Sequence, residues 1–163
     1  MITKLNELSL DEAFALIRSV TRKMDDEGIF QWDEIYPTRE ILRDDLRSGQ
    51  AYGYHGNDAL RGYIVLSEEY SPEYKSVRWN CAEGKSLVIH RLSVRPDCQG
   101  RGIAKRLMNH AEEHARNAGY LSIKLDAFVN NPAALKLYEG LNYSLAGTVR
   151  FRKGIFNCYE KVL

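Results

Sequence analysis

The residues best suited to chemistry lie in a glycine-rich segment near the middle of the chain. A β-like run ends just before this segment and a helical pattern begins just after it, so several backbone N–H groups without helical partners must converge there. Glycine permits the backbone angles of such a turn, and the helix macrodipole adds about half a positive charge. Together these features predict a phosphate-binding site. The glycines are Gly100 and Gly102, and the basic residues around them are Arg95, Arg101, Lys105 and Arg106.

The signatures of two common nucleotide-binding classes are missing. The chain has no G-x-x-x-x-G-K-(S/T) of a P-loop NTPase and no G-x-G-x-x-G followed by an acidic residue, as dinucleotide folds have. A glycine pair between a strand and a helix is also compatible with a tight turn that binds nothing. Motifs elsewhere in the chain must therefore decide between these interpretations.

Three spaced motifs, in a strand, turn and helix order, resemble the Gcn5-related N-acetyltransferase (GNAT) family. The family has an L-x-V strand end, a pyrophosphate loop that reads (Q/R)-x-x-G-x-(G/A), and a later N-x-x-A-x-x-x-Y helix. After that helix, Asn142 stands where the family usually has glycine, and asparagine tolerates the same left-handed helix cap. The matching residues are Leu92, Ser93 and Val94, then Gln99, Gly102 and Ala104, then Asn131, Ala134 and Tyr138.

The resemblance implies acetyl-CoA as the co-substrate. The strand end at Leu92 and Val94 would pair with the pantetheine arm, the Leu92 N–H would face the acetyl carbonyl, and Asn131 would contact the cofactor arm. Tyr138 would be the acid that protonates the departing thiolate, although a core aromatic is the alternative for this position. The expected cofactor-binding residues are Leu92, Ser93, Val94, Gln99, Gly100, Arg101, Gly102, Ile103, Ala104, Lys105, Asn131, Ala134 and Tyr138.

A general base is needed because an alkylamine with a pKa of about 10.4 is almost fully protonated at neutral pH. His90 is the candidate, since its ordinary pKa near 6.5 suits the task and it lies two residues before Leu92, on the face that a regular strand would share with it. Glu83 and Glu34 are weaker candidates, and a histidine packed in the sheet remains an alternative. His110 to His114 matches the H-x-x-E-H zinc pattern, but no third ligand is apparent and we expect no metal.

The charge distribution favours a cationic acceptor. Residues 1–80 hold 10 Lys and Arg against 15 Asp and Glu, whereas residues 81–163 hold 13 against 7. Because the resemblance assigns the basic half to the polyanionic cofactor, the acidic half should face a small cationic amine. Acidic residues next to Tyr70 and Tyr74 fit the same idea, with a solvated charged surface as the alternative. The expected acceptor residues are Trp32, Glu34, Tyr36 and Glu83.

Hydrophobic spacing and turn residues predict the elements that must position this site. A capping box at Ser9 opens the first helix, and a hairpin, a long strand ending at Pro96 and an amphipathic helix ending at Gly119 follow later. The fold class expected is α/β (α+β): a GNAT-like mixed, mostly antiparallel sheet flanked by helices on both faces, in a single domain over residues 1–163. The expected helices span residues 9–24, 37–49, 103–118 and 131–141, and the expected strands 2–5, 51–54, 60–66, 86–94, 121–127, 144–151 and 155–162.

Composition excludes other function classes. A formal net charge of +1 argues against a dedicated nucleic-acid binder, and no apolar run of about 18 residues could span a membrane. Without a secretion signal or paired cysteines, a cytoplasmic protein with reduced thiols is expected, as monomer or homodimer through an exposed final strand. The function expected is acetyl transfer to a primary amine; the alternatives are a peptide or protein N-terminal or lysine acetyltransferase and a non-catalytic acyl-CoA sensor.

Overall fold

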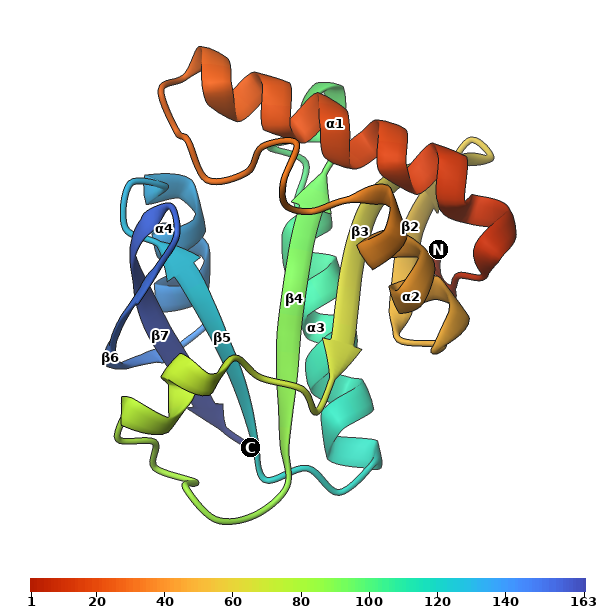
Figure 1. Ribbon diagram of the computed structural model, residues 1–163. Coiled ribbons are helices and arrows are strands. Elements are labelled where there is room, and N and C mark those ends of the chain that lie inside the picture. Colours follow the sequence, from red (N-terminus) through yellow and green to blue (C-terminus); the bar gives the residue numbers. More distant parts are fainter. The chain divides into compact units, whose positions relative to one another are not determined.

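Figure 1 presents the computed structural model of the protein, which describes all 163 residues. The chain separates into two compact units. The first unit is Met1–Leu66 with His90–His110, and the second is Ser67–Ile89 with Ala111–Leu163. Strand β4 (Ser86–Val94) and helix α3 (Ile103–Asn117) each contribute residues to both units.

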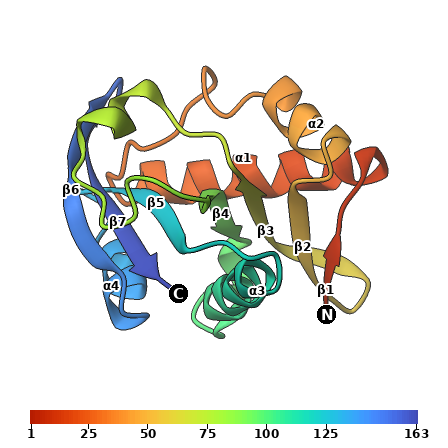
Figure 2. The ribbon, with the colours of Figure 1, turned by 90° about the horizontal axis from the view of Figure 1, so that it is seen from below.

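The first unit is built on a meander of antiparallel strands. Its strands hydrogen bond in the order β1-β2-β3-β4, and the Asn57-Asp58 turn between β2 and β3 has positive φ at both residues, as the predicted hairpin requires. Figures 1 and 2 show α1 and α2 on one side of β2 and β3 and the start of α3 on the other. The further elements are β1 (Ile2–Lys4), α1 (Leu10–Asp26), α2 (Arg39–Arg47), β2 (Ala51–Gly56) and β3 (Ala59–Ser67).

The core of the first unit lies under α1. Ala13, Leu16, Ile17 and Val20 recur at helical spacing and are buried, so they form one apolar stripe. This stripe packs against the buried leucines of α2 and the inner face of the strands. The helix α1 is thereby fixed on the sheet that carries β4.

The second unit contains the only parallel strand pair. Here the order is β4-β5-β7-β6, with β4 and β5 parallel from Ser86 opposite Ser122 to Val88 opposite Lys124, and the other pairs antiparallel. Helix α4 packs against β5, whose chain leads into it. The elements are β5 (Ser122–Phe128), α4 (Pro132–Gly140), β6 (Ser144–Phe151) and β7 (Gly154–Val162).

These pairings confirm the mixed, mostly antiparallel sheet, but two local expectations were wrong. Ser9 makes no capping hydrogen bond, because a 3-10 turn (Glu7–Ser9) capped by Asn6 precedes α1, and Glu12 instead accepts the Leu60 N–H at 2.8 Å. The final strand β7 is not an exposed edge, because it lies between β5 and β6. Asn142 has φ 68°, as expected for the helix cap.

Candidate functional site

The glycine-rich segment forms an exposed turn at the start of α3. Gly100 and Gly102 have φ of +77° and +79°, which glycine adopts without strain, and a Cβ placed at either would meet no atom within 4 Å. A short 3-10 turn (Pro96–Cys98) with buried Cys98 connects β4 to this segment. The open space in front of both glycines leaves room for a ligand to approach the backbone.

Unpaired backbone donors point out of this turn. The N–H groups of residues 100–105 have no hydrogen-bond acceptor in the first unit, and the first helical bond is from Arg106 N to Gly102 O at 3.1 Å. Arg101 and Lys105 are exposed and pair with no carboxylate. By contrast, Arg95 is paired with Asp97 at 2.7 Å. The donors and the two available cations suit a phosphate group.

Gln99 anchors the turn to the end of β4. Its Nε2 donates to the Val94 carbonyl at 3.0 Å, and its Oε1 accepts from Lys23 Nζ of α1 at 2.5 Å. The first residue of the family's loop motif therefore holds the loop to strand and helix with its side chain. Gln99 would therefore contribute to ligand binding through its backbone.

Strand β4 is irregular at the candidate base. Arg91 has φ +52°, a left-handed conformation that interrupts the alternation of side chains. The strand is therefore not regular between His90 and Leu92, and the two-residue spacing alone does not place them on one face. His90 and Leu92 are both half-buried, and Ser93 is buried with its hydroxyl donating to the Arg91 carbonyl at 3.0 Å.

The strained Arg91 is held by a buried ion pair that the sequence did not reveal. Its guanidinium donates to both carboxylate oxygens of Asp45, from Nε at 2.9 Å and from Nη2 at 2.5 Å. The two side chains are only 11% and 7% exposed. Tyr63 donates to the same carboxylate at 2.9 Å, and the Tyr36 hydroxyl accepts from Arg91 Nη1 at 2.8 Å. Burial, then the charge of Asp45, raises the pKa of Tyr63.

The expected acceptor residues have different environments. Trp32 is 7% exposed within the core of the first unit, so its ring packs under α1 and forms no open wall. Glu34 is exposed, and Tyr36 is 37% exposed next to Arg91. Glu83 lies exposed in a loop of the second unit.

Tyr138 is buried on the inner face of α4 in the second unit. Asn131 caps this helix, because its side chain accepts from the Ala134 N–H at 3.3 Å, and Tyr138 follows two turns later. The Tyr138 ring lies 6.1 Å from the rings of both Tyr143 and Tyr159. Burial, together with the charge of Asp126, raises the pKa of Tyr138. The hydroxyl is therefore a hydrogen-bond donor over the whole physiological pH range.

Asp126 of β5 is the charged centre of this part of the second unit. It accepts from the Tyr74 hydroxyl at 2.6 Å, and it lies opposite Cys158 of β7. Burial raises the pKa of Asp126 against the effect of the Tyr74 hydrogen bond. Burial and the nearby Asp126 raise the pKa of the Cys158 thiol to about 12, so this cysteine is a poor nucleophile.

In the H-x-x-E-H segment, the side chains of Glu112 and His110 contact other side chains. Glu112 is buried and accepts from Lys161 Nζ at 2.8 Å and from the Tyr143 hydroxyl at 3.1 Å. The His110 ring packs against Tyr52 at 5.0 Å. Nowhere do three or more His, Cys, Asp or Glu side chains gather as a metal ion would require. No helix combines the length and apolar character of a membrane span.

The structure divides the expected site residues between the two units. The first unit holds the turn of residues 99–105, called the phosphate turn below, the end of β4 from His90 to Val94, and residues 32–36. The second unit holds Asn131, Ala134, Tyr138 and Glu83. Sequence reasoning missed Arg91, Asp45 and Asp126. In the sequence, each of these three is only a charged residue within a strand-like or helical run. A charged residue in such a run more often lies on an exposed face.

The chain is similar to known acetyltransferases in sequence and in structure. A family model described as the acetyltransferase (GNAT) family matches residues 10–143. N-acetyltransferase 8F1 of Rattus norvegicus is 35% identical over 63 residues, 39% of this chain and 28% of that protein. The chain thus spans about a quarter of the length of the first curated relatives it matches.

Two solved structures have the same fold. A GNAT-family acetyltransferase of Streptococcus agalactiae superposes with a TM-score of 0.87 at 20% identity, over 100% of this chain and 95% of that one. The PaiA N-acetyltransferase of Thermoplasma acidophilum, solved in complex with coenzyme A, gives 0.76 at 18% identity, over 100% and 98% of the two chains. Because the family model covers most of the chain, the protein belongs to the acetyltransferase (GNAT) family.

Proposed function

We propose that this protein transfers the acetyl group of acetyl-CoA to the nitrogen of a primary amine. In this reaction a C–N bond forms at the acetyl carbon, the C–S bond of the thioester breaks, and the amine loses a proton. The observation that carries the proposal is the row of unpaired N–H groups at residues 100–105, in a turn where both glycines leave open space. This row lies within the matched family region.

The phosphate turn and the end of β4 bind the co-substrate in this proposal. The N–H groups of residues 100–105 hold the pyrophosphate, with Arg101 and Lys105 adding charge. The backbone of Leu92 and Val94 pairs with the pantetheine arm, and the Leu92 N–H polarises the acetyl carbonyl. Gln99 keeps the turn and the strand end in register through its bond to the Val94 carbonyl.

Tyr138 stabilises the departing thiolate mainly as a hydrogen-bond donor. Full proton transfer from a tyrosine of pKa about 10 to a thiolate of pKa about 8.5 is already uphill by about 2 kcal/mol. The raised pKa of Tyr138 makes that transfer harder still. A hydroxyl that stays protonated nevertheless donates to the developing charge at any working pH.

His90 removes the proton of the amine, directly or through water. An amine of pKa about 10.4 is deprotonated about once in 2,500 molecules at pH 7, a penalty of about 4.6 kcal/mol in rate. The direction of the His90 side chain depends on the left-handed backbone of the next residue, Arg91. Glu34 and Glu83 are both exposed and are the alternative bases.

The acceptor is a small cationic amine, attracted by the acidic half of the sequence. Glu34 and Tyr36 are its binding residues, since both reach solvent in the first unit, whereas Trp32 supports them from the core. Surface attraction of this kind is screened by salt. For a cationic acceptor, kcat/KM should therefore fall as salt rises from about 50 to 500 mM.

The experiment is a thiol-release assay with acetyl-CoA and matched acceptors. The panel contains a diamine, its mono-N-acetylated form, an amino acid, and a peptide with a free N-terminus and an internal lysine. Fastest release with the diamine at low salt supports the proposal. Faster release with the peptide points to an N-terminal or lysine acetyltransferase, and CoA binding without release for any amine points to a sensor module. Faster acetylation of the amino acid than of the diamine contradicts the cationic acceptor.

A further inference from the structure

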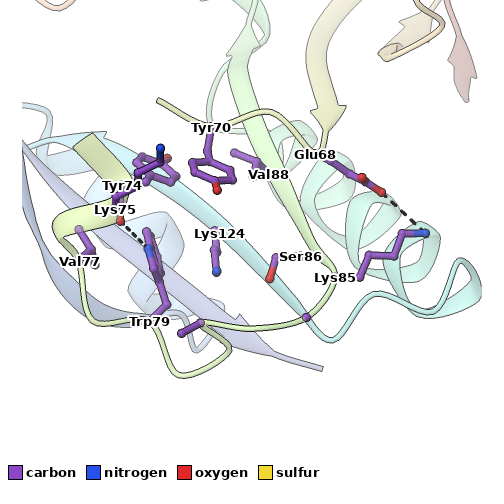
Figure 3. A pocket seen from close by; sticks show the side chains of 12 residues that line it. Glu68, Tyr70, Tyr74, Lys75, Val77, Trp79, Lys85, Ser86, Val88 and Lys124 are labelled. Carbon is purple, nitrogen blue, oxygen red and sulfur yellow. Dashed lines mark hydrogen bonds and ion pairs between the residues drawn. The ribbon is translucent and has the colours of Figure 1, made fainter. Parts of the chain in front are cut away.

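The second unit contains a cavity whose lining residues have no role in the proposed acetyl transfer. It has a volume of about 400 Å³, and Figure 3 shows it between the loop after β3 and the first half of β4. Pockets of this size hold small organic ligands. Its charged and aromatic lining residues include Glu68, Tyr70, Lys75, Trp79, Lys85 and Lys124.

The charges in the cavity wall are mainly positive. Glu68 is the only acidic lining residue, and it is already engaged: its carboxylate lies 3.8 Å from Lys85 Nζ and accepts from the Tyr120 hydroxyl at 2.8 Å. Lys75 and Lys124 remain without a carboxylate partner. The cation-binding role expected for the acidic residues near Tyr70 therefore does not fit this wall.

Lys124 is the central group. It projects from β5 between Trp79 and Ser86 in Figure 3, and the residue is 9% exposed. Its ammonium donates to the Cys81 carbonyl at 2.9 Å and lies 4.9 Å from the centre of the Trp79 ring. Since an ammonium has three N–H donors, two are left without a protein acceptor. A buried charge with unused donors calls for an anion or water.

The acidic groups near Lys124 do not neutralise it directly. Glu160 lies opposite Lys124 in the sheet, but its carboxylate accepts the N–H groups of Asn80 at 2.6 Å and Cys81 at 3.1 Å and forms no ion pair with the lysine. Asp126 points to Tyr74. Glu160 and Lys124 together fix the loop at residues 80–81, between the lining residues Trp79 and Ala82.

The apolar part of the wall is aromatic. The Tyr70 ring is stacked with that of Tyr74 at 6.1 Å and is 54% exposed, and Trp79 is held by a bond from Nε1 to the Tyr74 carbonyl at 2.9 Å. These flat faces suit a ring or a short apolar body. We propose that this cavity is a binding site for a small organic carboxylate with an aromatic body, whose carboxylate accepts hydrogen bonds from Lys124 while the body packs against Tyr70 and Trp79.

The test is direct binding in the absence of acetyl-CoA, which separates this proposal from the acetyl transfer. Three probes of nearly the same shape are titrated by calorimetry: phenylacetate, neutral phenylacetamide and cationic phenethylamine. Millimolar affinity is the scale expected for ligands of this size. Because a hydrogen bond to a charged group is stronger than a neutral one, phenylacetate should bind about tenfold or more tightly than phenylacetamide.

Variants assign the signal to the cavity. Lys124→Met should weaken phenylacetate to the level of phenylacetamide, and Lys124→Arg, which keeps the charge, should preserve the preference. Lys75→Met removes an exposed lysine from the same wall and should change the affinity by less than about twofold. Phenylacetate should quench tryptophan fluorescence in the parent and not in Trp79→Phe, because the other tryptophan, Trp32, lies in the first unit.

If Lys124→Met fails to fold, the relative affinities of the three probes for the wild-type protein still decide. Equal or tighter binding of phenylacetamide or phenethylamine would overturn it. The absence of saturable binding of phenylacetate would also overturn it and leave water as the partner of Lys124.

Discussion

Gly102 and Gly119 allow the phosphate turn to be tested with a matched control. They flank the two ends of α3, both have φ +79°, and a Cβ at either would meet no atom within 4 Å. Alanine at either position therefore costs only the strain of the left-handed backbone, about 1–2 kcal/mol. Both Gly→Ala variants should lower the thermal midpoint by about 2–8 °C. Because the strain is equal, any difference in CoA affinity between variants at Gly102 and Gly119 comes from their positions at the two ends of α3.

A glutamate at these positions adds a charge to the same strain. At about 5 Å from a bound phosphate, with an effective dielectric constant of about 20, Gly102→Glu costs about 3 kcal/mol of CoA affinity, or about 200-fold. Gly119→Glu should leave CoA affinity unchanged, because the 15 residues of α3 extend about 22 Å, beyond the Debye length of about 10 Å.

The assay is CoA titration by calorimetry, with folding checked by circular dichroism. CoA binding to folded Gly102→Glu with the affinity of the parent would refute a phosphate site at this turn. An equal loss of affinity in Gly119→Glu would also refute it, since the loss would then follow from strain and not from the phosphate turn.

Three further predictions concern the surroundings of the site. Asp45→Ala leaves the Arg91 charge buried and without its carboxylate partner, and should lower the free energy of unfolding in urea by about 3–5 kcal/mol. Asp44→Ala, which changes the exposed neighbour on α2, should lower it by less than about 0.5 kcal/mol. Similar losses in the two variants would mean that the ion pair is not the cause. Tyr138→Phe should lower kcat about 100-fold and leave the KM for acetyl-CoA unchanged, and parental turnover would exclude Tyr138 from the reaction. The pKa of Asp126 is raised, so its contribution to stability is full below its unfolded pKa and is lost as pH rises. Asp126→Asn should therefore gain in thermal midpoint over the parent as pH rises above about 4, and a constant difference would contradict the buried carboxyl.

The elements were predictable because their signals are local. The helix spacing of α3, the turn glycines and the helix cap at Asn131 each act within a few residues, and the structure has α3 and β4 where the pattern predicted them. Ser9 was the exception. Its capping box competes with Asn6, which caps the preceding turn, and the Glu12 side chain bonds to Leu60 in a distant part of the sequence.

The charged interior was not predictable, because it depends on what covers each face. Lys124 and Asp126 alternate with Ile123 and Leu125, and such alternation predicts a strand with one polar face in solvent. The two residues do share a face, but the loop after β3 covers it, as the contacts of Tyr74 and Cys81 show. Arg91 and Asp45 are 46 residues apart, and nothing local links them.

The position of β7 has a consequence for biosynthesis. It is the last of the seven strands along the sequence, yet it lies between β5 and β6 and pairs with β5 over seven residues. While the chain emerges from the ribosome, β5 and β6 each present an open hydrogen-bonding edge until residues 154–162 have also emerged. The second unit therefore completes its sheet only after β7 has emerged. In the meantime these edges are the surfaces through which nascent chains would aggregate or engage a chaperone.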